Sequence, residues 1–208
     1  MKNLNQVLAK GLLILLLSIS LVSCASIPEL KLHYQLPPAS DQLKGMQVLL
    51  AFEDARDIKQ ILGPGAKKEL KNFSGNISFS VARHKEPGFK IGALQFSGLI
   101  REAFKRRLEN LGLGLLTEQS AGTPQLLIIL SEFTLDLVNR RWVVQMSYEA
   151  RLVKNGKVLA AQTISGQAER YKLLGRREAD TALGEIFTDL INRLDVVRLF
   201  QQARLIGS

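Results

Sequence analysis

One stretch of the sequence, residues 125–171, constrains the fold more than any other. The segment 125–138 reads QLLIILSEFTLDLV and ends at Asn139-Arg140, and a second turn candidate, Asn155-Gly156, lies farther along. An Asn-Gly pair between two hydrophobic runs is the strongest short-range signal for a β-hairpin. The stretch therefore predicts three consecutive antiparallel strands.

A tight turn at Asn139-Arg140 would fix which side chains lie opposite each other. It places six pairs on one face, and five of them are wholly apolar: Leu137–Trp142, Leu135–Val144, Phe133–Met146, Ser131–Tyr148, Ile129–Ala150 and Leu127–Leu152. The second turn would pair Leu152 with Leu159 and Ala150 with Ala161. Because a slip of one residue turns each set to the opposite face, we expect a strongly specified register.

Periodic apolar residues predict the other elements. Recurrence at two-residue steps predicts strands, and recurrence at three- and four-residue steps predicts amphipathic helices. The predicted strands cover 46–53, 77–82 and 113–116, and the predicted helices cover 94–111 and 177–197. Two such helices can cover one face of a mostly antiparallel sheet, so we expect an α+β two-layer sandwich.

The N-terminal segment indicates export. Residues 1–10 carry Lys2 and Lys10 but no acid, and residues 11–22 carry no charge. A basic start followed by an apolar run of about 7–15 residues is typical of a secretory signal peptide. A membrane-spanning helix would need roughly 20 apolar residues.

The chain's single cysteine, Cys24, ends this segment. Leu21, Val22 and Ser23 precede it, and the four residues resemble the bacterial lipobox. That resemblance implies recognition of Leu21, Val22 and Ser23 by a signal peptidase, cleavage before Cys24, and attachment of diacylglycerol and an N-acyl chain to Cys24. One acyl chain binds membranes only reversibly, whereas three would hold the protein essentially permanently. An ordinary signal peptide with a chance cysteine is the alternative.

We therefore expect three segments. These are a cleaved signal peptide (1–23), a lipidated cysteine with a flexible tether (24–44) that includes a short strand at Leu30–Leu36, and one periplasmic domain (45–208). Ala25 and Ser26 follow the cysteine where an Asp would favour inner-membrane retention. The expected location is thus the outer membrane, facing the periplasm.

The charge of the mature chain restricts its partners. Loss of Lys2 and Lys10 leaves 26 basic and 19 acidic residues, a net charge of +7. An exported protein meets phospholipid head groups, lipopolysaccharide phosphates and cell-wall carboxylates, so we expect no nucleic-acid partner. Arg101, Lys105 and Arg106 in the first predicted helix are candidates for contact with such an anionic surface, and the alternative is an ordinary solvated helix face.

The residues offer little for catalysis. No His or Cys spacing predicts a metal site, so no metal or cofactor is expected. Glu53, Asp54 and Asp57 lie at the end of a predicted strand and could hold a cation or act as acid and base. We favour the interpretation that these acids pair with Arg56.

Short motifs give a family resemblance. The chain is similar to the YajG-like family of small bacterial lipoproteins, in which a strand runs into Asp-x-Arg and then a Leu-Gly pair, and a helix ends in a Leu-x-x-x-Gly turn. The matching residues here are Asp54, Arg56, Leu62, Gly63, Leu108 and Gly112. The resemblance implies an envelope lipoprotein of α+β fold and transfers no activity.

These observations lead to one functional expectation with two alternatives. We expect a non-enzymatic, membrane-anchored adaptor that binds another envelope protein. The first alternative is a binder of lipid, lipopolysaccharide or another anionic envelope molecule, or an accessory subunit of a lipid transport system. The second is a hydrolase that uses Glu53, Asp54 and Asp57.

Overall fold

The structure is a computed structural model that describes residues 29–207, apart from 84, 85, 87, 121 and 174–176. The helices in the described residues are α2 (Pro64–Glu69), α3 (Phe96–Glu109), α4 (Arg177–Arg193) and α5 (Val196–Gln202). The strands are β1 (Leu30–Gln35), β2 (Gln47–Asp54), β3 (Asn76–Ala82), β4 (Phe89–Gln95), β5 (Gly114–Leu116), β6 (Gln125–Val138), β7 (Arg141–Lys154) and β8 (Lys157–Tyr171).

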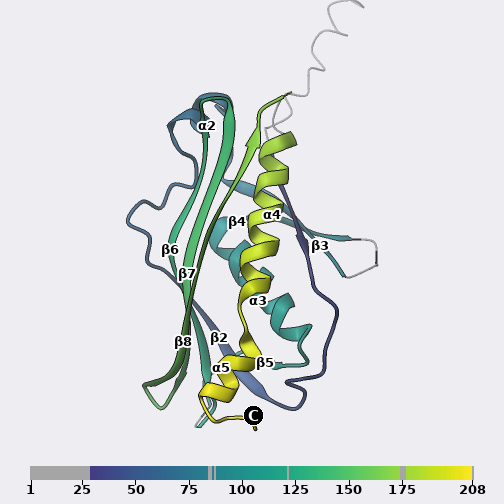
Figure 1. Ribbon diagram of the computed structural model, residues 1–208, viewed down its shortest axis with the longest axis vertical. Coiled ribbons are helices and arrows are strands. Elements are labelled where there is room, and N and C mark those ends of the chain that lie inside the picture. Colours follow the sequence, from purple (N-terminus) through teal and green to yellow (C-terminus); the bar gives the residue numbers. More distant parts are fainter. Residues whose placement is uncertain (1–28, 84–85, 87, 121, 174–176, 208) are drawn as a thin grey trace, which may run out of the picture.

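Two sheets enclose the long helices. The larger sheet has the order β5-β2-β6-β7-β8, and the smaller has the order β1-β3-β4. Helix α4 packs against β1 of the small sheet and against β7 and β8 of the large one, and α3 also contacts both sheets (Figure 1). The apolar core therefore fills the space between the two sheets and around these helices.

The predicted α+β sandwich is confirmed, with a second sheet that the sequence did not predict. That sheet exists because β1 joins β3 in parallel and β4 joins β3 in antiparallel pairing. Strand β2 also runs parallel to both of its neighbours, β5 and β6, so the large sheet is mixed.

The three consecutive long strands are confirmed, but their register is correct over only part of the sheet. The turn at Asn139-Arg140 has positive φ at both residues (48° and 62°), and the pairs Leu137–Trp142, Leu135–Val144 and Phe133–Met146 are as predicted. A β-bulge then inserts Ser131 into β6. A bulge adds one residue to one strand, so the two faces of β6 exchange beyond it.

The pairs predicted beyond the bulge are therefore wrong. Tyr148, Ala150 and Leu152 lie opposite Leu130, Ile128 and Leu126, not opposite Ser131, Ile129 and Leu127. A second shift, between Leu152 and Val153, moves the partners in β8 by one residue. Leu152 pairs with Ala160 and Ala150 pairs with Gln162, instead of Leu159 and Ala161.

The strand predicted at Leu30–Leu36 is confirmed as β1, and it lies inside the domain. Leu30, Leu32 and Tyr34 are at most 1% exposed. The Tyr34 hydroxyl donates to Asn192 Oδ1 at 2.8 Å, and Asn192 Nδ2 donates to the Gln35 carbonyl at 2.9 Å. Residues 30–36, which were predicted to lie in the tether, thus belong to the folded domain, with Leu30, Leu32, Tyr34 and Leu36 in its core.

Several helix boundaries differ from the predicted ones; α3, for example, ends at Glu109 instead of residue 111. Helix α3 begins at Phe96 instead of residue 94, because strand β4 occupies the preceding residues. The segment 54–76, for which no helix was predicted, contains α2. The helix predicted over 177–197 stops at Arg193, and the Asp195 side chain accepts a hydrogen bond from Arg198 N (2.9 Å) to start the separate helix α5.

Candidate functional site

The acidic residues at the end of β2 include Asp54, which pairs with the buried Arg56. Arg56 is 5% exposed and donates from Nε to Asp54 Oδ1 (2.9 Å) and from Nη2 to Oδ2 (2.7 Å). Its guanidinium lies 4.8 Å from the centre of the Phe96 ring. The side-chain hydrogen bond from Arg56 lowers the pKa of Asp54 to about 2. The predicted pairing with Arg56 is confirmed for Asp54.

The same carboxylate also contacts Lys59, whose Nζ lies 3.5 Å from Asp54 Oδ1. Arg56 and Lys59 thus both contact the Asp54 carboxylate, which leaves it little capacity to hold a metal ion or to exchange a proton near neutral pH. Glu53 and Asp57 are both exposed. Within the described part of the chain, no group of three or more His, Cys, Asp and Glu residues is placed to bind a metal.

A cavity of about 710 Å³ opens beside this ion pair, between α2 and the start of α3. Its apolar lining comes from Ile61, Leu62, Leu70, Phe73 and Phe96. Its charged lining comes from Arg56, Lys59, Lys67 and Lys71 together with Asp54. An apolar interior with an excess of cations fits a ligand that joins an anionic group to an apolar body. We call this space the basic cavity.

Strand β6 positions the α2 wall of the basic cavity. Asp136 Oδ1 accepts hydrogen bonds from the backbone N–H groups of Gly65 (2.8 Å) and Ala66 (3.0 Å) at the start of α2. This site was not predicted from the sequence. The available signal was the run of lysines after Gly63-Pro64-Gly65, but nothing local placed Lys67 and Lys71 around the same cavity as Phe96.

The second feature is the face of the large sheet that turns away from α3 and α4. Burial alternates along β6 and β7, so one face is in the core and the other is open to solvent. The Ser131 bulge turns Leu127 and Ile129 to this open side, and Ala51 pairs with Leu127 there. We define the open-face patch as Leu49, Leu127, Ile129, Val153 and Val158. Val158 is 54% exposed and the other four are half-buried.

Strand β8 forms the edge of the large sheet next to this patch. Residues 158–168 of β8 carry no charged side chain. Edge strands usually carry charges or prolines that prevent pairing with another chain. Residues 158–168 therefore lack these protective side chains, although Arg193 of α4 donates to the Ser165 carbonyl of β8 at 3.2 Å.

The candidate basic residues of α3 do not form an isolated cationic patch. Arg106 is ion-paired with Glu102 (2.7 Å) and Glu109 (3.6 Å) on its own helix, while Arg101 is exposed and Lys105 is half-buried. The two glutamates neutralise much of the local charge. Contact of Arg101, Lys105 and Arg106 with an anionic surface stays a prediction.

The predicted lipidation site lies outside the described residues, as do Leu21, Val22 and Ser23. Lipidation at Cys24 therefore stays a prediction. Among the helices that the structure describes, none combines the length and the apolar character needed to cross a membrane.

Comparison with known proteins supports the fold. No family model and no curated protein matches the sequence. The crystal structure of protein XCC0632 from Xanthomonas campestris, of family DUF330, superposes with a TM-score of 0.57 at 15% identity, covering 87% of this chain and 100% of that one. At this identity the likeness shows a shared fold alone.

Weaker likenesses include two proteins described as lipoproteins. A minor lipoprotein from Acinetobacter baumannii gives a TM-score of 0.34 at 10% identity, covering 76% of this chain and 91% of that one. Lipoprotein GNA1162 from Neisseria meningitidis gives 0.27 at 14% identity, covering 72% and 99%. These scores are too low to add to the fold assignment, and the YajG-like resemblance stays a prediction.

Proposed function

We propose that this chain is a lipid-anchored envelope lipoprotein whose domain is a non-enzymatic adaptor for another envelope protein. The open-face patch is the observation that carries the proposal. Exposed apolar patches bordered by polar residues mark interaction surfaces on soluble domains. Here the ion-paired Glu149 and Arg151 lie opposite Ile129 and Leu127 on the same face. The anchor is proposed on the lipobox of Leu21, Val22, Ser23 and Cys24, with the outer membrane, facing the periplasm, as the location.

The edge of β8 suggests how the partner binds. An extended segment can add to an exposed sheet edge through main-chain hydrogen bonds, and side-chain pockets then give specificity. Here Val158 and Leu159, 54% and 37% exposed, lie at the start of that edge, beside the rest of the patch. The proposed partner therefore contributes an extended apolar segment that lies along β8 and covers the patch.

Photo-cross-linking in intact cells tests the adaptor role. A photoreactive phenylalanine analogue is placed at Leu127 or Val158 in the full, lipidated chain, and at Gln201 on α5 as an exposed control. We expect one envelope protein to be captured from the patch positions and not from the control. Equal capture from all three positions, or capture of lipid alone, would contradict the proposal.

The basic cavity favours a second candidate function, binding of an anionic amphiphile such as a fatty acid or a lysophospholipid. This candidate includes the role of an accessory subunit in lipid transport. Titration with a fluorescent fatty acid tests it. We expect Lys59→Gln with Lys71→Gln to weaken binding about tenfold or more, because each substitution removes a cation from the rim. Lys154→Gln with Lys157→Gln, at the β7–β8 turn, is the matched control, and equal binding by both pairs would overturn the assignment.

A further inference from the structure

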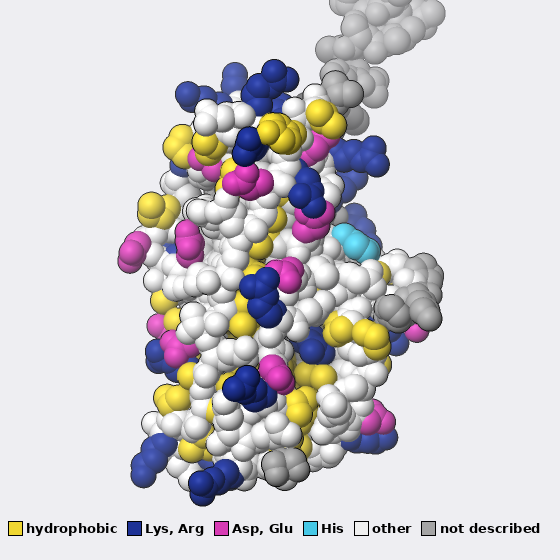
Figure 2. Space-filling model, in the orientation of Figure 1, with side chains coloured by type: hydrophobic (Ala, Val, Ile, Leu, Met, Phe, Trp, Pro, Cys, Tyr) yellow, Lys and Arg dark blue, Asp and Glu magenta, His cyan; other side chains and the backbone are white. Residues whose placement is uncertain are grey.

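One end of the molecule combines exposed basic and exposed apolar side chains. Its basic residues are the exposed Lys68 and Arg140 and the half-buried Lys172, and its exposed apolar residues are Val138, Tyr171 and Leu173. We call these six residues the anchor pole. Figure 2 shows Lys and Arg side chains gathered at this upper end of the view, with hydrophobic side chains among them.

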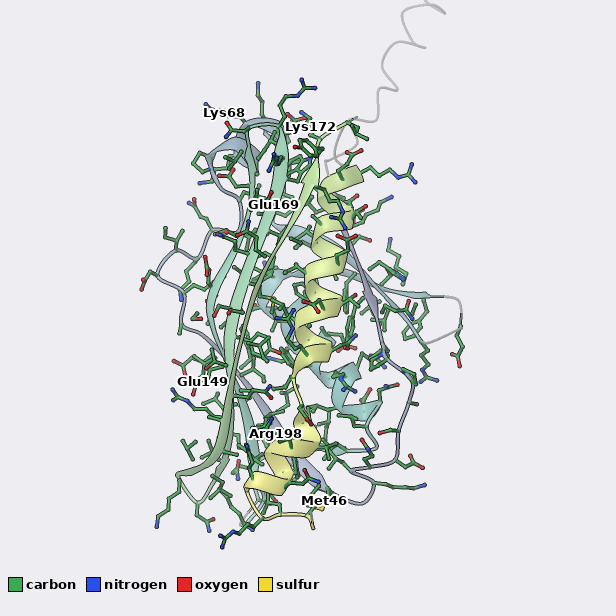
Figure 3. The ribbon with its side chains drawn as sticks, viewed as in Figure 1. Met46, Lys68, Glu149, Glu169, Lys172 and Arg198 are labelled. Atoms are coloured by element: carbon green, nitrogen blue, oxygen red, sulfur yellow. The ribbon has the colours of Figure 1, made fainter. Side chains whose placement is uncertain are left out.

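Backbone and side-chain contacts hold the anchor pole together. The Lys172 backbone N–H donates to the Arg140 carbonyl at 2.9 Å, which joins the end of β8 to the β6–β7 turn. The Lys172 ammonium pairs with Glu69 of α2 at 2.5 Å. Lys68 and Lys172 accordingly lie at the same end of the molecule in Figure 3. Three segments that are distant in the sequence thus form one surface.

The apolar residues of the anchor pole are unusually exposed. Val138 is 47% exposed, Tyr171 is 62% exposed and Leu173 is 76% exposed. The Arg141 guanidinium lies 4.7 Å from the centre of the Tyr171 ring and donates to its hydroxyl at 2.7 Å. Tyrosine and leucine interleaved with Lys and Arg are typical of surfaces that lie in the head-group region of an anionic bilayer.

The first strand starts at the same end. The Lys31 backbone N–H donates to Asp180 Oδ1 at 2.8 Å, so β1 begins beside the first turn of α4, which follows the end of β8. Cys24 and Leu30 are six residues apart in the sequence. Six residues span at most about 20 Å even when fully extended. A lipid on Cys24 would therefore hold this end of the domain close to the bilayer.

We infer that the anchor pole rests on the anionic phospholipid surface into which Cys24 is inserted. The inference rests on the lipid anchor of the proposed function and adds an orientation to it. Lys68 and Arg140 contact phosphate groups, Lys172 holds the pole together through Glu69, and Val138, Tyr171 and Leu173 enter the head-group layer. The β7–β8 turn at Asn155-Gly156 lies at the opposite end of the long strands and points into the periplasm.

Site-specific fluorescence tests this orientation. The lipidated full chain is reconstituted into phosphatidylglycerol–phosphatidylethanolamine vesicles with an environment-sensitive dye on a cysteine at Val138→Cys or Leu173→Cys. Val158→Cys, 54% exposed and at the opposite end, is the control. With Cys24 acylated, the introduced cysteine is the single free thiol. We expect a blue shift and quenching by membrane-embedded quenchers at Val138→Cys and Leu173→Cys but not at Val158→Cys.

Charge variants test the role of the basic residues. Lys68→Gln with Arg140→Asn neutralises two charges, and Asn readily takes the positive φ of residue 140. We expect this pair to lose most of the quenching, whereas Lys154→Gln with Lys157→Gln keeps it. Vesicle-bound protein with no difference among the three dye positions would overturn the orientation. Protein that fails to bind vesicles at all would instead contradict the lipid anchor.

Discussion

Asp136 accepts a hydrogen bond from the backbone N–H of Gly65, 71 residues away in the chain, at 2.8 Å. The contact leaves no room for a side chain at residue 65 of α2. A Cβ on Gly65 would lie 2.0 Å from the Leu137 carbonyl oxygen. A Cβ on Gly63 would lie 2.3 Å from Asp136 Cγ. The two glycines therefore allow α2 to dock on β6 and to form a wall of the basic cavity.

We expect Gly65→Ala to lower the free energy of unfolding by about 1–3 kcal/mol, because overpacking forces the backbone of α2 or β6 to shift. Urea denaturation followed by circular dichroism measures the change. Gly98→Ala is the matched control, since a Cβ on Gly98 meets nothing within 4 Å and the residue lies in α3. Alanine is the better helix former by about 1 kcal/mol, so the control should be neutral or stabilised. Equal stability of the two variants would contradict the tight contact.

The Ser131 bulge shows why the sequence predicted the strands but only part of their register. Beyond Ser131 the run Leu126–Leu130 is apolar at every position, so both faces of β6 satisfy the same pattern. Alternation can locate a face only where polar residues mark the other side. The bulge therefore left no local signal, and Leu127 and Ile129, which it turns to the open face, were predicted as core.

The candidate sites and the small sheet could not be predicted because they depend on contacts between residues that are still farther apart in the sequence. The strand at Leu30–Leu36 was predicted, but its parallel pairing with β3 and its packing on α4 follow from contacts such as Tyr34 with Asn192. The basic cavity brings residues between 54 and 97 together, yet its α2 wall is fixed by Asp136. Such placements depend on tertiary packing, which periodicity does not encode.

The register beyond the bulge makes opposite predictions for two adjacent leucines. Leu126 is fully buried, whereas Leu127 is half-buried on the open face. We expect Leu126→Ala to lower the free energy of unfolding by about 2–5 kcal/mol and Leu127→Ala by about 1 kcal/mol or less. Urea denaturation of both variants measures the difference. The register predicted from the sequence has no bulge and would bury Leu127 instead of Leu126. A larger loss of stability for Leu127→Ala than for Leu126→Ala would therefore refute the structure of this part of β6.

The ion pair of Asp54 and Arg56 predicts a pH dependence of stability. The pKa of Asp54 is lowered from 3.8 to about 2, so the folded state favours the ionised carboxylate. The resulting stabilisation is fully present above pH 3.8 and is lost as the pH falls through about 2. We expect the stability difference between the wild type and Asp54→Asn to narrow by on the order of 2 kcal/mol between pH 5 and pH 2.

Denaturant titrations at several pH values measure this narrowing. Asp57→Asn is the control, because Asp57 is exposed and neutral Asn replaces the same type of carboxylate three residues along the chain. The free energy of unfolding of Asp57→Asn should change with pH in the same way as that of the wild type. A constant difference between the wild type and Asp54→Asn across this range would show that Arg56 does not select the ionised form of Asp54.

The lipid anchor makes the last prediction, on which the orientation of the domain also depends. Because the Cys24 sulfur is the proposed attachment atom, Cys24→Ala should abolish palmitate labelling and leave a precursor that retains residues 1–23. Ser26→Ala, two residues along, should be processed and labelled like the wild type. Gel mobility and palmitate labelling in cells measure both effects. A labelled protein of mature size from Cys24→Ala would refute the anchor, and with it the expectation that residues 25–29 hold the anchor pole against the bilayer.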